Sequence, residues 1–362
     1  VRADWSSARE LGCFGLKRDT FVVRLSIVIL HLDTPEFLEK TLLSVLPDRG
    51  AEDEVLVVRA RPYADPYHLA EEVRFLETPG AGWAEAANEG LRAAQAPLVH
   101  LLQSGVESPP AGFEQALGHF ADPRIAAVSP RILDAQSPQR SVGAGWTLTD
   151  GGRIRQVHIW TPKQKHVSDG PSSDSVANTC PDTLSIPAPD PSSVIFRKEL
   201  ALAWGGFHKG WTPRGAWLEM GLAMTAAGFR LVVEPGWTAQ IPRNFPPGHS
   251  AGQLARDAER LFWQWTPRPI SLGRLIRHGA AVVGEWLASG PTPSALARIV
   301  GRAAGLLQGI RMEPGRSRAS RLFRPFRKPS LQGSHGRASD ASGRTGLSMP
   351  PIGKQAHLIF QK

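Results

Sequence analysis

The hydrophobic residues of this chain fall into short runs that alternate with helical patterns. The runs at Arg24–His31, Glu54–Val58, Val73–Glu77 and Pro97–Leu102 are rich in Val, Ile and Leu. Nearly continuous apolar runs of this length are typical of strands that are buried on both faces of a parallel sheet. Because amphipathic segments lie between most of them, the pattern predicts β-α-β units and an open, doubly wound α/β sheet.

Capping residues support the expected helices. Thr34 offers an N-cap and Pro35 a first helical position for a helix at Glu36–Leu46, and a Gly-rich turn leads into a second helix within Gly80–Gly90. The later elements are expected as a strand at Ser192–Arg197, helices at Lys198–Ala203 and Ala216–Ala227, and a strand at Phe229–Glu234.

Composition divides the chain into parts. We expect an N-terminal extension at 1–23, an α/β domain at 24–267, a helical appendage at 268–311 and a disordered, Arg-rich tail at 312–362. Residues 143–191 are rich in Gly, Ser, Asp and Pro, which predicts a loop-rich insertion with strand-like pieces at Ile154–Trp160 and Thr183–Ile186. Helical patterns precede the tail at Ala251–Trp265, Ser271–Ala288 and Ser294–Ile310.

Charge is unevenly distributed along the chain. The 362 residues are 41% hydrophobic and carry a formal net charge of +9. The tail contributes most of this charge, because it contains ten Lys and Arg and two acids, Glu313 and Asp340. The tail composition predicts solvated disorder rather than specific nucleic acid binding. The last two helical patterns combine apolar residues with arginines, so they are expected either to pack on the α/β domain or to contact an anionic membrane surface.

Targeting signals and cysteines bear on location. The first twenty residues include Asp4, Glu10 and Asp19 and no long apolar core, and no later run reaches the ~18 apolar residues of a membrane span. Cys13 and Cys180 lie in no metal-binding spacing. We therefore expect free thiols and a cytoplasmic protein, either free or peripheral to the inner face of the membrane.

The order of these elements from Arg24 to about Pro267 resembles the family-2 glycosyltransferases, which have the GT-A fold. The resemblance implies transfer of a sugar from a nucleotide-sugar donor to a glycan or lipid acceptor, as in the synthesis of cell-envelope polysaccharide. In open α/β sheets, ligands bind at the carboxyl ends of the strands. The donor-binding positions implied in this way are His31, Asp33, Arg59, Arg61, Asn88, Gln103, Gly105 and Glu107.

The metal motif of that family is absent from this sequence. Its Asp-x-Asp element falls on Gln103 and Gly105, and only Glu107, beyond the motif, is acidic. The family uses Mg²⁺ or Mn²⁺, and such hard cations require carboxylate oxygens. We therefore predict no metal site, and expect Arg59, Arg61 and His31 to neutralise a diphosphate if the protein is active.

The catalytic base of the family is also replaced. Its Glu-Asp pair falls on Ala216 and Trp217, which leaves Glu219 and His249 as weak candidates for a base. Trp211 and Trp217 are expected on the acceptor side, where an indole ring can stack on a sugar. Three functions stay open: a transferase that is impaired or metal-independent, a non-catalytic pseudoenzyme that binds carbohydrate or stabilises a partner, and a membrane-surface adaptor.

Overall fold

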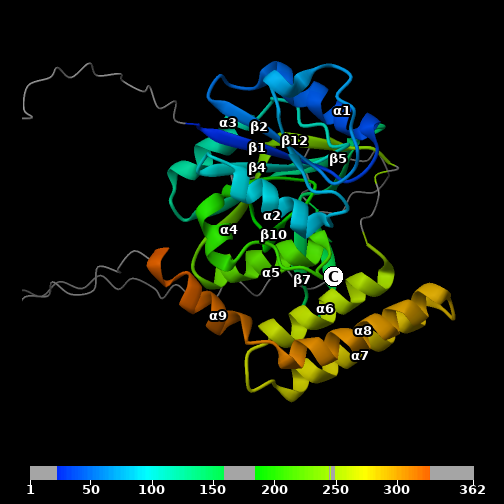
Figure 1. Ribbon diagram of the computed structural model, residues 1–362. Coiled ribbons are helices and arrows are strands. Elements are labelled where there is room, and N and C mark those ends of the chain that lie inside the picture. Colours follow the sequence, from blue (N-terminus) through cyan, green and yellow to red (C-terminus); the bar gives the residue numbers. More distant parts are fainter. Residues whose placement is uncertain (1–22, 159–183, 244, 246–248, 327–362) are drawn as a thin grey trace, which may run out of the picture. The chain divides into compact units, whose positions relative to one another are not determined.

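A mostly parallel sheet forms the centre of the protein (Figure 1). The computed structural model describes residues 23–158, 184–243, 245 and 249–326. Within these residues the sheet has nine strands, in the order β3-β2-β1-β4-β11-β5-β12-β9 with β6 beside β5. The strands are β1 (Leu25–His31), β2 (Asp53–Arg59), β3 (Arg74–Glu77), β4 (Leu98–Gln103), β5 (Ile125–Asp134), β6 (Ser137–Gly143), β9 (Leu184–Ser185), β11 (Ser193–Arg197) and β12 (Arg230–Ile241).

Strand direction changes in the middle of this sheet. The strands β1, β2, β3 and β4 run parallel to one another, as the sequence predicts. The strand β11 runs antiparallel to both β4 and β5, and β12 runs parallel to β5. The amino end of β11 therefore lies beside the carboxyl end of β4, with Ser193 opposite Leu102.

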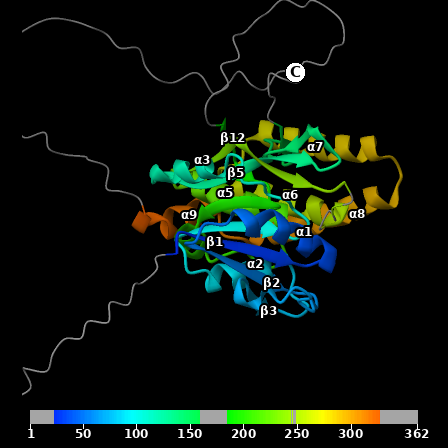
Figure 2. The same cartoon turned by 90° about the horizontal axis from the view of Figure 1, so that it is seen from above.

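Helices cover both faces of the sheet (Figures 1 and 2). Alternate residues of β1 point to opposite faces, so that Ile27 and Ile29 join one core cluster and Val28 and Leu30 join the other. The first cluster includes residues of α1 (Pro35–Val45) and α3 (Phe113–Gly118). The second includes residues of α2 (Trp83–Ala93), α4 (Lys198–Trp204) and α5 (Pro213–Ala226).

A second, three-stranded sheet occupies part of the expected insertion. It consists of β7 (Gly145–Leu148), β8 (Ile154–Val157) and β10 (Ala188–Pro189) in the order β10-β7-β8. The strand-like pieces expected near Ile154 and Ile186 are present as β8 and β9. Residues 159–183 lie outside the described residues, as do Cys13, Cys180 and the N-terminal extension up to residue 22.

The C-terminal helices extend further than we expected. The helices α6 (Ala251–Trp265), α7 (Leu272–Ser289) and α8 (Pro293–Arg311) match the sequence patterns, and none of the described helices is long and apolar enough to cross a membrane. A further helix, α9 (Gly315–Leu322), lies where we expected the disordered tail to begin. Its Ala319 and the following Phe323 are fully buried, which is the physical reason for the difference. The tail from residue 327 onward lies outside the described residues.

Candidate functional site

Two adjoining cavities open at the carboxyl ends of the parallel strands. The first, which we call the strand-end pocket, has a volume of about 320 Å³ and lies between the ends of β1, β2 and β4 and the start of α2. The second, the wide cleft, has a volume of about 700 Å³ and is lined by residues from β5, β6, β12 and the start of α5. Gln103 and Pro213 line both cavities, so the two spaces are neighbours.

A third cavity, of about 400 Å³, lies at the opposite end of the sheet. Its charged residues include Arg24 and Asp53, which pair with each other at 3.0 Å. Ligands of open α/β sheets bind at the carboxyl ends of the strands. The strand-end pocket and the wide cleft are therefore the better candidate for a functional site.

The strand-end pocket combines one acid, one cation and a helix start. Asp33, just after β1, is half-buried, and this burial raises its pKa, with partial offset from the Gln103 amide. Arg61, just after β2, is exposed and donates a long hydrogen bond of 3.4 Å to the carbonyl of Leu32. Gly82 is the N-cap of α2, and the backbone N–H groups of a helix start favour an anion.

Arginines and histidines line the wide cleft. They are Arg140, Arg214, Arg243, His158 and His249. Arg214 lies over the Trp146 ring at 4.0 Å, and burial lowers its pKa while Asp190 partly restores it. Burial and the neighbouring Arg214 lower the pKa of His249 to about 4, so this imidazole is neutral at pH 7. The cleft thus holds a half-buried guanidinium beside a neutral imidazole.

Asp190 is an acid of the wide cleft that the sequence analysis missed. Its Oδ2 accepts a hydrogen bond from Trp146 Nε1 at 2.9 Å, and its Oδ1 accepts bonds from Ser192 N at 3.0 Å and Ser192 Oγ at 2.6 Å. Asp190 lies at the end of the stretch 143–191, which we expected to be a loop-rich insertion, just before the Ser192–Arg197 strand pattern. Because β11 runs antiparallel to β4, the residues before β11 reach the same edge as those after β4. The Asp-Pro pair just before the Ser192–Arg197 pattern was the available signal.

Gly105 does not fit a metal-binding carboxylate. Its φ of +94° favours glycine, and a Cβ built there would lie 3.1 Å from Phe37 and 3.3 Å from Phe245. Its N–H also donates to Phe37 O and Thr41 Oγ1, each at 2.9 Å. The backbone at this point is thus fixed in a conformation that an aspartate cannot adopt without strain.

The surrounding residues do not fit a divalent cation either. Glu107 pairs through its backbone with Gln240 and lines neither the strand-end pocket nor the wide cleft. Among the residues that the structure describes, no cluster of three His, Cys, Asp or Glu side chains is arranged to hold a metal ion. The residues described here therefore offer no ligand set for the Mg²⁺ or Mn²⁺ that the sequence resemblance implies.

His31 and Arg59 lie on the other face of the sheet from the strand-end pocket. Burial lowers the pKa of His31, whose ring packs against Tyr63 at 6.0 Å. Arg59 forms an ion pair with Glu77 and lies over the Phe75 ring at 4.6 Å. Because side chains alternate along a strand, His31 and Arg59 point to the same face as Ile29 and Val57. Of the three residues that we expected to face a diphosphate, only Arg61 therefore lines the cavities.

Asn88 holds the turn before α5 in place. Its Nδ2 donates to Phe207 O and its Oδ1 accepts from Phe207 N, both at 2.8 Å. Gly206, which has a φ of +76°, lies so close that an added Cβ would be 2.3 Å from Asn88 Oδ1. Asn88 therefore supports the site indirectly, by fixing the turn that leads to Pro213 and Arg214 at the cleft.

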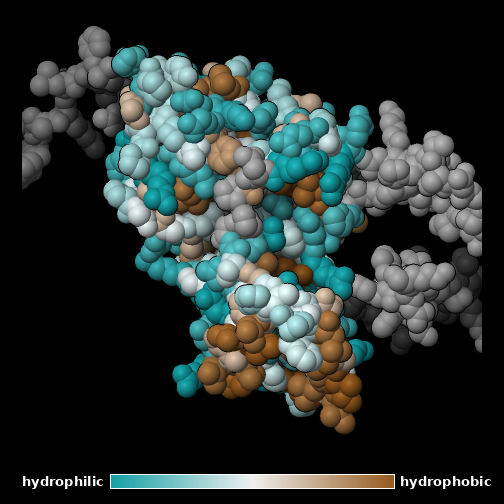
Figure 3. Space-filling model, turned by 90° about the vertical axis from the view of Figure 1, so that its right-hand side faces the viewer, coloured by the Kyte–Doolittle hydropathy of each residue, from teal (hydrophilic) through white to brown (hydrophobic). Residues whose placement is uncertain are grey.

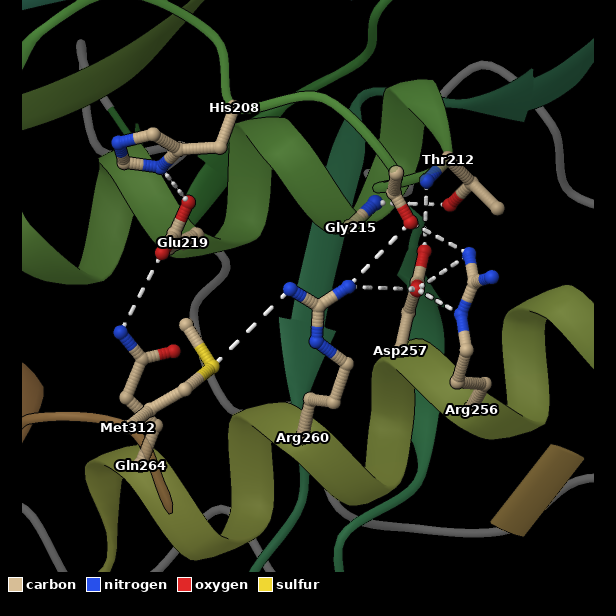
Figure 4. Close-up of polar contacts among 10 residues, drawn as sticks. His208, Thr212, Gly215, Glu219, Arg256, Asp257, Arg260, Gln264 and Met312 are labelled. Carbon is tan, nitrogen blue, oxygen red and sulfur yellow. Dashed lines mark hydrogen bonds and ion pairs between the residues drawn. The ribbon is translucent and has the colours of Figure 1, made fainter. Parts of the chain in front are cut away.

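Glu219 lies on α5, within the polar contacts drawn in Figure 4, and it lines neither cavity. It is 1% exposed, and its carboxylate accepts hydrogen bonds from His208 Nδ1 at 2.7 Å and Gln264 Nε2 at 3.3 Å. Arg318 donates to the other ring nitrogen of His208 at 2.8 Å, which leaves the Nδ1 proton for Glu219. These contacts make Glu219 part of the interface between α5, α6 and α9.

The tryptophans expected on the acceptor side are buried instead. Trp217 is fully buried and packs against Phe196 and Phe207 at ring distances of 5.2 and 5.0 Å. Trp211 is 6% exposed and lies under the Arg260 guanidinium at 3.8 Å. Neither ring is open to a sugar, and this placement corrects our expectation.

A network of buried charge fixes the start of α5 on α6 (Figure 4). Asp257 on α6 is fully buried, and its Oδ2 accepts from the Thr212 N–H at 2.7 Å. Its Oδ1 lies 3.3 Å from Arg256 and 4.0 Å from Arg260, both of which also donate to the carbonyl of Gly210. Thr212 caps α5, so the network sets the position of the helix that carries Arg214 into the cleft.

Comparisons with known proteins agree with this architecture. No family model and no curated protein matches the chain. A solved structure of GalNAc-T7 with UDP, GalNAc and Mn²⁺ aligns at 15% identity and a TM-score of 0.50, over 69% of this chain and 49% of that one. The chain thus spans about half the length of that protein.

Two other solved structures align over more of their length. The mannosyltransferase PcManGT from Pyrobaculum calidifontis aligns at 16% identity and a TM-score of 0.45, over 84% of this chain and 85% of that one. TarS 1–349 of S. aureus aligns at 11% identity and a TM-score of 0.49, over 83% and 85%. All these structures have the GT-A fold, and the likeness to GalNAc-T7 shows that this chain has a GT-A-like fold.

Proposed function

We propose that this protein is a family-2-like glycosyltransferase that binds a nucleotide-diphospho-sugar without a metal ion. The nucleotide part would occupy the strand-end pocket, and the sugar would extend past Gln103 into the wide cleft. One observation carries the proposal: the two cavities meet at the strand ends, where arginines stand and a metal-binding carboxylate cluster is missing from the described residues. The GalNAc-T7 structure, which has a similar fold, contains UDP and Mn²⁺. We propose that in this chain arginines, and not a metal ion, supply the positive charge that binds the diphosphate.

Arg61 and Arg214 are suited to replace the cation. A guanidinium forms paired hydrogen bonds with phosphate oxygens and stays charged at neutral pH. Arg214 is half-buried over the Trp146 ring, where its attraction for an anion is screened less than at the surface. The N-terminus of α2 would add backbone N–H donors on the other side of the pocket.

Transfer would require a base for the acceptor hydroxyl. Asp190 is the best-placed carboxylate, because it lines the wide cleft and is fixed by Trp146 and Ser192. In an inverting step it would take the hydroxyl proton while the acceptor oxygen bonds to the sugar C1 and the nucleoside diphosphate leaves with the electron pair. The acceptor would be a glycan or a lipid.

Calorimetric titration tests the binding part of this proposal. The full chain is titrated with UDP-glucose, UDP-N-acetylglucosamine and GDP-mannose, first with EDTA and then with Mn²⁺. We expect one of these donors to bind with a dissociation constant that is the same with EDTA and with Mn²⁺. Binding that requires Mn²⁺ contradicts the metal-free arrangement, and no binding at millimolar donor contradicts a donor site altogether.

A second candidate function is a pseudoenzyme that binds the donor or a carbohydrate without turnover. The observation that favours it is the replacement of the family's Glu-Asp pair by Ala216 and Trp217, both buried. Release of the free nucleotide, measured with bound donor and a range of acceptors, separates the two functions. Turnover that is lost in Asp190→Asn, with donor affinity kept, supports the transferase, and binding without turnover supports the pseudoenzyme.

A further inference from the structure

The helix α8 packs with its small residues inward. Gly301, Gly305 and Gly309 are buried, and an added Cβ on Gly301 would lie 2.0 Å from the carbonyl of Gly252 on α6. A Cβ on Gly305 would likewise lie 2.4 Å from the carbonyl of Arg256. The spacing of four residues places these glycines on one face, which lets the backbones of α6 and α8 approach closely.

The apolar side chains of α8 therefore point away from the protein. Its exposed residues include Leu296, Ile299, Val300, Leu307 and Ile310, with exposed fractions between 45% and 68%. They recur at the three- and four-residue intervals of a single helix face. This pattern is the reverse of an ordinary surface helix, which buries its large apolar residues and exposes its small and polar ones.

The helix α7 repeats this reversed pattern. Its large apolar side chains at the same intervals are also exposed, namely Leu272, Leu275, Ile276, Val283, Trp286 and Leu287. Its buried residue is His278, which bonds to Glu259 of α6 at 3.0 Å. In Figure 3 the apolar side chains gather at the end of the molecule formed by α7 and α8, whereas the rest of that face is mostly hydrophilic. We call this surface the hairpin face.

Arginines border the hairpin face and indicate the kind of partner that it fits. Residues 268–311 contain six arginines and one acid, Glu285, which pairs with Arg302 at 2.7 Å. Arg277 and Arg311 are exposed and form no ion pair with any residue that the structure describes. An exposed apolar face bordered by free arginines is the pattern of a helix that lies in the headgroup region of an anionic bilayer.

We propose that the hairpin face docks on a bilayer that contains anionic lipids, with the apolar residues in the interface and the arginines at the headgroups. A second copy of the chain fits less well, because two such faces would bring like charges together at the rim of the contact. In this arrangement α7 and α8 lie along the membrane surface, since none of the described helices is long and apolar enough to cross a bilayer.

Flotation with vesicles tests the proposal on the full chain. Vesicles of phosphatidylcholine alone are compared with vesicles that contain phosphatidylglycerol at a third of the lipid. We expect binding to the anionic vesicles that weakens at high salt. A triple variant, Ile276→Ser, Leu287→Ser and Leu307→Ser, should bind about tenfold more weakly or worse, because it removes apolar area that enters the interface.

Leu43→Ser is the matched control, since Leu43 is 74% exposed on α1 and far from α7 and α8 in sequence. We expect it to bind like the unchanged chain, and because all the substituted residues are exposed, both variants should fold normally. The proposal is overturned if the unchanged chain does not float with anionic vesicles, or if the triple variant floats equally well. It is also overturned if the chain is a dimer that ignores vesicles and the triple variant turns it into a monomer.

Discussion

Arg214 at the start of α5 and Glu219 in the middle of the same helix lie in contrasting electrostatic surroundings. At its start, Arg214 faces the wide cleft and is balanced only in part by Asp190. Further along, Glu219 is enclosed by His208 and Gln264, and on the adjoining α6 Asp257 is enclosed by Thr212, Arg256 and Arg260 (Figure 4). One helix thus carries a charge that is open to a ligand and an acid whose hydrogen bonds are made within the protein.

The contrast separates structural charges from candidate functional ones. A buried charge whose hydrogen bonds are all made within the protein is costly to unpair, so its removal is expected to change stability. A charge that lines a cavity and keeps bonding capacity is free to bind a ligand, so its removal is expected to change affinity. This distinction assigns Glu219 and Asp257 to stability and Arg214 to binding.

The largest effect is expected for Asp257→Ala. The substitution leaves Arg256 and Arg260 without their carboxylate and the Thr212 N–H without its acceptor, and should lower the free energy of unfolding by about 3–5 kcal/mol. Chemical denaturation measures the change. Asp122→Ala is the control, because among the described residues the ion pair of Asp122 is with exposed Arg124, and it should leave stability nearly unchanged. Equal losses in the two variants would show that the network has no special role.

The next effect is expected at the cleft. Arg214→Ala should weaken donor binding by about 10- to 100-fold, which is the usual contribution of a charge-assisted hydrogen bond, and should change stability little. Arg256→Ala is the matched variant, since Arg256 pairs with Asp257 in the buried network and does not line the cleft. It should lower stability and leave the dissociation constant unchanged. If calorimetry finds the same affinity loss in both variants, the contrast between the cleft and the buried network is wrong.

A buried histidine at the third cavity, away from the cleft, extends the comparison to pH. His100 on β4 is 1% exposed, and burial lowers its pKa to about 3. The unfolded chain therefore takes up this proton below its ordinary pKa of about 6.5, and stability is lost as pH falls from there toward 3, by about 2 kcal/mol at pH 5. Denaturation midpoints across this range give the slope. The His100→Gln variant should show a flatter slope, and an unchanged slope would mean that other groups cause it.

The smallest effect is expected for Glu219→Gln. The amide keeps the shape of the side chain and an acceptor for His208, so stability should fall by only about 1 kcal/mol. Donor affinity should stay the same, because Glu219 lines neither cavity. A clear loss of turnover with unchanged stability would restore Glu219 as a catalytic candidate.

Much of the fold was predictable because strand and helix periods are local properties. The strands β1, β2 and β4 follow from continuous apolar runs, and the end of α5 from Gly228. The strand β5 was missed because Pro130 interrupts its pattern, and β12 was expected to end too early because Pro235 and Gly236 resemble a turn. The structure resolves these two residues as an irregularity in the pairing with β5.

The site was predictable only in part. Strand ends located the cavities, and Arg61, Asp33, Gln103 and His249 do line them. Side chains alternate between the two faces of the sheet up to the last residue of a strand. We expected His31 and Arg59 at the pocket because they end β1 and β2, but they point to the opposite face. Asp190 and Arg214 reach the cleft through an antiparallel strand and a helix start, and the direction of that strand within the sheet is not visible in a local pattern.

The backbone at Gly105 limits how this protein can be engineered. Introducing two acids by Gln103→Asp and Gly105→Asp would place the second carboxylate at a φ of +94°, against the rings of Phe37 and Phe245. The loop after β4 would have to be rebuilt, together with its hydrogen bonds to α1, before a cation could be held. A designed metal site at this position therefore needs a new loop conformation as well as new side chains, and these two substitutions do not supply it.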